Sequence, residues 1–403
     1  MRCISFAGSG IYQNQRYCRD NLCVETDLTQ EAIWRLYGPD EIILCLSDPS
    51  GARIASDLDG RKIPLKKLWI PFGTDEKQLY EIFSTICGVV IRGEEILFEI
   101  TAGYHSLPFI TLVASSYLHS VMQVTITGIV YAPGPGDDGF CRFVDLKPIM
   151  NILNWIKSVN ALTDYLDAEP IIGLLSSLQT EIHRSGKYPD PPVRLTGWST
   201  LLGKFCDSIQ LARPVDAMYA AYGITREAET VRKELHMYAP SLVPVINEIS
   251  VITGLAAEPE VSGCSYEYVR KQVRLIDYQI EKGLYLQAVT LGREVLITLL
   301  MIKTGFGMEW KDTDLRHEFS RTLTGGALSL QKKEYKLTEY SSEISGIKSW
   351  KEMVMIWIKI SELRNNLAHC GMTRRNDSVK SLKIRTKEIL PNIERFMELC
   401  ENE

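Results

Sequence analysis

Short apolar runs alternate with amphipathic stretches in the first third of the chain. The apolar runs are rich in β-branched residues and have the length of strands, and the stretches between them have helical periodicity. Strands that alternate with helices indicate a mostly parallel sheet with helices on both faces. The predicted strands are 2–7, 41–46, 65–70, 96–101 and 124–131, and the predicted helices are 28–36, 76–89, 106–121 and one soon after Tyr12.

The pattern changes after Asp145 and becomes almost wholly helical. Residues 148–257 are predicted to form helices, with a loop at 187–194 where the sequence reads KYPDPPVR. Residues 284–303 form a strongly amphipathic helix, whereas 312–345 are polar and weakly periodic and are predicted to be rich in loops. The predicted fold is an α/β N-terminal domain of Rossmann-like type followed by an all-α C-terminal half, with domains at 1–147, 148–263 and 264–403.

The most clearly bounded helix lies within residues 349–371. Ser349 and Glu352 match the S-x-x-E capping box of a helix start, and Gly371 stands where a left-handed C-terminal cap is expected. Between them, one apolar stripe recurs at steps of three and four residues, as on the buried face of a helix. Its members are Met353, Ile356, Ile360, Leu363 and Leu367.

Arg364 and His369 stand at the end of this helix and join a permanent cation to an imidazole that titrates near neutral pH. His369 lies in the last turn, where the helix dipole favours a protonated imidazole. Residues five apart point roughly 140° away from each other on a regular helix. The two side chains can therefore converge only if the last turn loosens, if Arg364 reaches round, or if a second copy of the helix completes the site. In the third case, we expect the apolar stripe to pack near the twofold axis of a dimer.

Glycines, hydroxyls and His105 follow the predicted strands, at the carboxyl ends where parallel sheets bind ligands. Few carboxylates occur there, so a phosphate-bearing ligand suits these ends better than a metal. Gly8-Ser9-Gly10 follows the first strand, where a glycine turn lets backbone N–H groups approach an anion; a plain tight turn explains it equally well. It fails as a dinucleotide fingerprint because Gln13 occupies the third glycine position.

Composition favours a soluble globular protein of two or three domains, with 403 residues, 45% apolar and 24% charged. No run of about 18 apolar residues appears and the N-terminus does not resemble a signal peptide, so no contact with a membrane is expected. The ten cysteines form neither a C-x-x-C pair nor a zinc-type group, and scattered thiols favour a reducing cytoplasm. Cys370 is expected to be an apolar filler, with a nucleophile as the alternative.

Charge is uneven along the chain. Residues 1–264 carry 22 Lys and Arg against 31 Asp and Glu, whereas 265–403 carry 23 against 19, so a polyanion is expected to meet the C-terminal part. Six basic residues lie between Arg374 and Lys387 and form either a solvated helix face or an RNA track. Glu294 either orients the distant arginine or histidine or is an ordinary solvent-side charge.

Separate stretches of the chain resemble one family, the CRISPR-associated ribonucleases with CARF and HEPN domains. Residues 99–108 (EITAGYHSLP) resemble the D-x-T-x-G-F-R-x-L-P signature of CARF domains, and 6–12 (FAGSGIY) resemble the first strand and turn of the same domains. Asp145-Leu146, followed by an aromatic-bearing helix, fits as well. Residues 364–369 (RNNLAH) look like the R-N-x-x-A-H form of the HEPN motif.

The resemblance implies a type III CRISPR ancillary ribonuclease. In that family the CARF domain, here 1–147, binds a cyclic oligoadenylate, and binding switches on the HEPN domain, here 264–403, which cuts single-stranded RNA without a metal or other catalytic cofactor. Both domains dimerise in that family, so the resemblance implies a homodimer and leaves open whether dimers assemble further; it favours cyclic tetra-adenylate as the activator. It implies that Gly8, Ser9, Gly10, Tyr12, Thr101, Gly103, Tyr104, His105 and Ser106 contact the activator, and that Arg364, Asn365 and His369 form the ribonuclease site.

Three residues depart from the family pattern. Glu99 replaces the usual Asp, Tyr104 the usual Phe, and His105 the usual Arg. An arginine holds phosphate through a fixed fork of donors at any pH, whereas histidine donates from both nitrogens only when it is protonated.

The chemistry expected at the C-terminal site follows from the residue types. RNA carries its own nucleophile, the 2′-OH; a histidine can remove its proton or protonate the leaving 5′-oxygen, and an arginine can stabilise the extra charge at phosphorus. The expected product end is a 2′,3′-cyclic phosphate. The alternatives are a non-enzymatic CARF-type nucleotide sensor that binds partner proteins, and a nucleotide-dependent metabolic enzyme.

Overall fold

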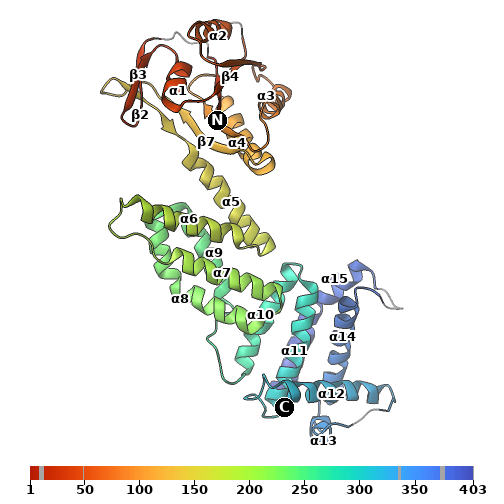
Figure 1. Cartoon of the computed structure of the whole chain (residues 1–403). Coiled ribbons are helices and arrows are strands. Elements are labelled where there is room, and N and C mark those ends of the chain that lie inside the picture. The colour runs from red at the N-terminus through yellow and green to blue at the C-terminus, as the bar shows by residue number, and fades with distance from the viewer. Residues whose placement is uncertain (9–12, 49, 335–336, 373–376, 403) are drawn as a thin grey trace. The chain divides into compact units, whose positions relative to one another are not determined.

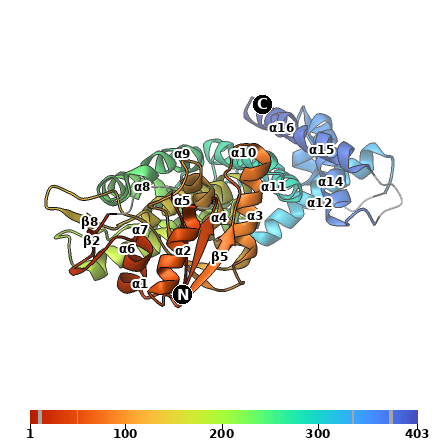
Figure 2. The ribbon, with the colours of Figure 1, turned by 90° about the horizontal axis from the view of Figure 1, so that it is seen from above.

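The computed structural model describes residues 1–8, 13–48, 50–334, 337–372 and 377–402. The chain forms two compact units, Met1–Asn154 and Trp155–Glu403, and each is treated on its own (Figures 1 and 2). An α/β sheet region occupies the first unit, and the second is all-helical. The predicted fold class is therefore confirmed.

The first unit is built on a six-stranded sheet with the order β5-β4-β1-β6-β7-β9. All neighbours pair in parallel except β7 and β9. The strands are β1 Arg2–Phe6, β4 Glu41–Leu46, β5 Leu65–Trp69, β6 Glu95–Glu99, β7 Thr125–Tyr131 and β9 Val144–Asp145. The five predicted strands correspond to β1, β4, β5, β6 and β7, because each is a buried run of the length that such a sheet requires.

Helices cover both faces of this sheet, each with its own apolar core. On one face α3 (Glu76–Gly88) and α4 (Leu107–Met122) pack through residues such as Ile82 and Leu118. On the other, α1 (Thr29–Tyr37) and α2 (Ser50–Gly60) pack through residues such as Ile33 and Leu58. Helix α2 was not predicted, whereas the other three were.

A hairpin, β2 (Gln15–Arg19) and β3 (Leu22–Thr26), replaces the helix predicted after Tyr12, and it pairs with β8 (Phe140–Arg142) in a second sheet. A two-residue turn at 20–21 joins the strands, and Asp20 takes the left-handed φ of 51° that short hairpin loops require. That prediction was wrong because pairing with β8, which is distant in the sequence, stabilises strands here in place of a helix.

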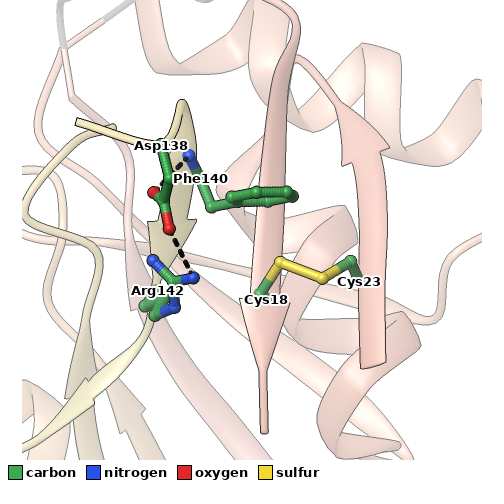
Figure 3. The surroundings of a disulfide bond; sticks show 5 residues. All are labelled: Cys18, Cys23, Asp138, Phe140 and Arg142. Carbon is green, nitrogen blue, oxygen red and sulfur yellow. Dashed lines mark hydrogen bonds and ion pairs between the residues drawn. A yellow bond between two sulfur atoms is a disulfide. The ribbon is translucent and has the colours of Figure 1, made fainter. Parts of the chain in front are cut away.

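A disulfide between Cys18 and Cys23 closes this hairpin (Figure 3). The two residues face each other in the register of β2 and β3, with their Cα atoms 4.2 Å apart. The expectation of free thiols throughout was wrong for this pair, because the strand pairing places two cysteines directly opposite each other. Cys370, expected as an apolar filler, is an exposed free thiol.

The second unit has one apolar core that runs from Leu162 to Cys400. Its helices are α6 Glu169–Ser185, α7 Leu195–Gln210, α8 Pro214–Tyr238, α9 Val243–Gly254, α10 Tyr266–Glu281, α11 Tyr285–Lys303, α12 Thr313–Leu330, α13 Ser341–Ser345, α14 Trp350–Ala368, α15 Val379–Lys387 and α16 Ile389–Glu401; α5, Lys147–Tyr165, crosses the boundary between the units. The loop predicted at 187–194 lies between α6 and α7. The division into 148–263 and 264–403 remains a prediction.

Helix α12 occupies the stretch that was predicted to be rich in loops. Asp312 caps its start by accepting a hydrogen bond from the Leu315 N–H at 2.8 Å, and Phe319 and Leu323 are buried four residues apart. The prediction was wrong for 313–330, because a polar sequence with few apolar contacts still forms a helix when tertiary packing buries those few. It was correct for 331–334 and 337–340, which are turns and irregular backbone.

Helix α11 is the centre of the C-terminal part of this unit. It packs against α10, α12, α14, α15 and α16. By length and composition alone it could cross a membrane, but 61% of its most apolar window is buried inside the protein, as in the core helix of a soluble protein. Its apolar character is therefore explained by packing within the chain.

Candidate functional site

The N-terminal candidate site lies where the strand order of the large sheet reverses. β1 has β4 and β5 on one side and β6 and β7 on the other. Gly8 follows β1 and Thr101 follows β6, so the loops after both strands flank the switch point where open α/β sheets bind ligands. Ser9, Gly10 and Tyr12 lie outside the described residues.

The two loops at the switch point are in close contact because both contain glycine. A Cβ atom on Gly8 would lie 3.0 Å from the Ala102 Cβ and 3.4 Å from the Gly103 N. Gly103 has a φ of +116°, and a Cβ there would lie 2.6 Å from the Leu107 Cδ1. The structure thus brings Gly8 together with Thr101–Gly103 as the sequence predicted, and no larger side chain fits at Gly103 without displacing Leu107.

Glu99 is a buried support for the loop after β6. Its carboxylate accepts hydrogen bonds from the Ser5 Oγ at 2.5 Å and from the Thr101 N–H at 2.7 Å. Burial raises the pKa of Glu99, although these two hydrogen bonds act in the opposite direction. Thr101 Oγ1 in turn accepts from the Ala132 N–H at 2.9 Å. Glu99 and Thr101 therefore hold the loop after β6 in place through these hydrogen bonds.

Tyr104 connects the ends of three strands. Its hydroxyl donates to Asp48 Oδ2 at 3.4 Å, beyond β4, and its ring packs edge-on against Phe72, beyond β5, at 5.4 Å between centroids. His105 is exposed and Ser106 is partly buried. The start of α4 offers few free donors, because the Leu107 N–H is bonded to the Tyr104 carbonyl and Pro108 has no N–H. A bound phosphate would therefore depend on the loops and on His105.

The C-terminal candidate site lies at the end of α14. The apolar stripe of this helix is buried in the chain's own core, with Met353, Ile356, Ile360 and Leu363 each at most 4% exposed. The suggestion that this stripe packs at the twofold axis of a dimer was therefore wrong, since other helices of the same chain cover it. Any shared site must form through the exposed end of α14 instead.

Arg364 is near enough to a second arginine, Arg293 of α11, for its charge to act on it. Burial lowers the pKa of Arg293; the carboxylate of Glu294 opposes this shift, and the positive charge of Arg364 adds to it. Arg293 donates to Glu294 at 3.0 Å and to Ser320 at 2.8 Å. Sequence reasoning did not select Arg293; its signal was a lone arginine inside the apolar helix 284–303.

Glu294 supports this arginine pair without contacting the motif directly. It accepts from Arg316 at 2.7 Å as well as from Arg293. With the described residues, the Arg364 guanidinium forms no hydrogen bond or ion pair. Glu294 is therefore neither a plain solvent charge nor a direct partner of Arg364; it holds the neighbouring arginine in place.

His369 and Asn365 occupy the last turn of α14, and both are exposed. The His369 N–H donates to the Asn365 carbonyl at 3.0 Å, and the His369 carbonyl accepts from the Met372 N–H at 2.9 Å. Gly371 has the left-handed backbone conformation that was predicted, with a φ of 74°. Cys370 is also left-handed, with a φ of 55°. The backbone thus turns sharply after His369, while its side chain makes no hydrogen bond to Arg364.

The start of α14 differs from the predicted capping box. Ser349 occupies the N-cap position, but its side chain makes no capping hydrogen bond. Glu352 pairs instead with Arg395 of α16 at 2.7 Å, which lowers the pKa of Glu352. The prediction of a helix start here was correct, and the predicted cap was wrong because a tertiary ion pair competes for the carboxylate.

In the part of the chain that the structure describes, no group of three or more His, Cys, Asp or Glu side chains lies together in a way that could hold a metal ion.

Comparison with known proteins found a partial similarity to a CRISPR-associated protein but no matching family. No protein-family profile matches the chain. A segment of 118 residues, 28% of this chain, is 29% identical to CRISPR-associated protein MJ1674 of Methanocaldococcus jannaschii and covers 19% of that protein. The match thus spans about a fifth of the relative's length. The chain is distantly and partially similar to a CRISPR-associated protein.

Proposed function

We propose that this chain is a CRISPR-associated endoribonuclease that cuts single-stranded RNA when a cyclic oligoadenylate binds its N-terminal unit. The observation that carries the proposal is a set of cations along α14: Arg293 stacks on the Trp357 ring at 4.5 Å, Arg364 follows two turns later, and the exposed His369 comes five residues after Arg364. Cations of this kind stabilise the charge that builds up on a phosphorus centre under attack.

The proposed reaction uses the RNA's own 2′-OH. His369 removes its proton or protonates the leaving 5′-oxygen, Arg364 stabilises the phosphorane-like charge, and Asn365 orients the substrate. The products are a 2′,3′-cyclic phosphate and a free 5′-OH, and no metal takes part. Because Arg364 and His369 are not bonded to each other, we propose that the site becomes complete between two copies of the chain.

We propose that the activator binds at the switch point and contacts Gly8, Thr101, Gly103, Tyr104, His105 and Ser106. Ser9, Gly10 and Tyr12 belong to the proposed site on the sequence alone. The close contact of its glycine-containing loops favours a phosphate-bearing ligand, and we propose cyclic tetra-adenylate. An exposed apolar stripe on α4, formed by Phe109, Val113, Tyr117 and Val121 at steps of four, supports a homodimer.

The test is a fluorogenic RNA assay in EDTA with cyclic tri-, tetra- and hexa-adenylate. We expect cleavage with one ring size, and none in Arg364→Ala or His369→Ala variants that still fold and bind the activator. Cleavage that survives in either variant would refute the proposed site. Binding of a cyclic oligoadenylate without any cleavage by the wild-type chain would favour a non-enzymatic sensor instead.

A further inference from the structure

A groove of about 350 Å³ lies between α15 and the start of α11. Three lysines of α15 line it at steps of three and four residues, which places them on one face of the helix. The lining residues are Tyr285, Val379, Lys380, Lys383, Ile384 and Lys387.

The positive charge of this groove is not neutralised within the described residues. Lys380, Lys383 and Lys387 have no ion pair there, whereas Arg385 on another side of the same helix is paired with Asp377. The groove therefore carries three ammonium groups that can bind an external anion.

The groove also presents flat and apolar surface beside its charges. Tyr285 and Lys383 both line the groove, and the Lys383 Nζ lies over the Tyr285 ring, 5.7 Å from its centre. Val379 is 71% exposed and Ile384 is 51% exposed. A charged groove with an aromatic ring is the combination by which proteins hold single-stranded nucleic acid, with phosphates on the cations and a base stacked on the ring.

The groove lies at the same end of the helical unit as Arg364 and His369. Helix α15 packs on both α11 and α14. Asn366, two residues beyond Arg364, donates to Asp377 at 3.1 Å, and Asp377 also binds Arg385 of α15. A single-stranded RNA that extends from the proposed cleavage site at the end of α14 therefore reaches α15 next.

We propose that this groove binds single-stranded RNA, with its phosphates on Lys380, Lys383 and Lys387 and one base on Tyr285. The inference extends the proposed function, since it names the path of the substrate beside the cleavage site. It requires unpaired bases, because a duplex keeps its bases stacked and offers only its backbone.

The experiment measures RNA binding apart from cleavage, by fluorescence anisotropy of a short labelled RNA on the full chain carrying His369→Ala. In that background, K380Q/K383Q/K387Q is compared with K204Q/K233Q/K333Q, which removes three exposed lysines elsewhere on the helical unit. We expect the groove variant to flatten the slope of log K against log salt by about 2, because each phosphate contact on a single strand contributes about 0.7. The control variant should change that slope much less.

The aromatic part is tested with Tyr285→Leu, which keeps an apolar side chain but removes the ring, and with Tyr285→Phe, which keeps the stacking surface. We expect roughly tenfold weaker binding for the first and little change for the second. Equal effects of the two lysine variants, or no loss with Tyr285→Leu, would overturn the groove assignment. Groove-dependent binding in a chain that never cleaves RNA would support the groove while refuting the proposed function.

Discussion

The guanidinium of Arg293 lies 4.5 Å from the centre of the Trp357 ring, so an arginine of α11 is stacked on α14 two turns before Arg364. Trp357 is 2% exposed and cannot move aside without disturbing the core. The ring, Ser320 and Glu294 together hold this guanidinium in place, although the positive charge of Arg364 acts on it. Arg293 is thereby a positioning residue for the proposed site.

Replacing Arg293 with Gln is expected to lower RNA cleavage by roughly tenfold or more, because the second cation beside Arg364 is lost. Arg293→Lys should restore part of the activity, since it keeps the charge while losing the planar stack on Trp357. Cleavage rates with the activator at saturation provide the measurement. Arg226→Gln on α8, an exposed arginine, is the matched control. Full activity in Arg293→Gln would show that this cation has no part in the reaction.

Glu99 is expected to make the stability of the first unit depend on pH. Its folded pKa is raised by burial, so protonation favours the folded state. The contribution is therefore complete below the usual glutamate pKa, and the free energy of unfolding falls as the pH rises from there through the raised folded pKa. Urea unfolding at a series of pH values measures this slope.

Glu99→Gln should remove this part of the slope, because an amide does not titrate. Glu95→Gln, at the exposed start of the same strand, should keep the wild-type profile. The assignment fails if Glu99→Gln and the wild type lose stability in parallel over the same range.

Reduction of the Cys18–Cys23 disulfide is expected to lower the free energy of unfolding of the first unit by about 2 kcal/mol, the value for closing so short a loop. Denaturant unfolding with and without a reductant gives the measurement. C18A/C23A should be insensitive to reductant and resemble the reduced wild type. A wild type whose stability does not respond to reductant would indicate that the two thiols stay unbonded in solution.

The exposed stripe of α4 is expected to carry the proposed dimer contact. Phe109 is 74% exposed and Val113 is 59% exposed, so F109D/V113D should leave the fold intact and shift the chain to a monomer in light scattering. Leu22→Asp, at an equally exposed apolar position of the hairpin, should remain dimeric. A wild-type chain that is monomeric at all concentrations would contradict the homodimer itself.

Local pattern was sufficient for most of the fold. The runs 41–46 and 124–131 became β4 and β7, and the stripe of Met353 and Ile360 became the buried face of α14, because period and burial are properties of neighbouring residues. Gly8 after β1 and the loop after β6 also lie together at the ligand-binding edge that the sequence indicated, since parallel strands end at one edge of a sheet.

Packing alone decided the rest, because it joins residues that are distant in the chain. The hairpin of Cys18 and Cys23 depends on pairing with β8, more than a hundred residues later. Arg293 stacks on Trp357 only because α11 and α14 lie side by side, and Glu352 forms its ion pair with Arg395 only because α16 returns to α14. No local period carries such information, since these contacts arise when separate apolar faces are buried against one another.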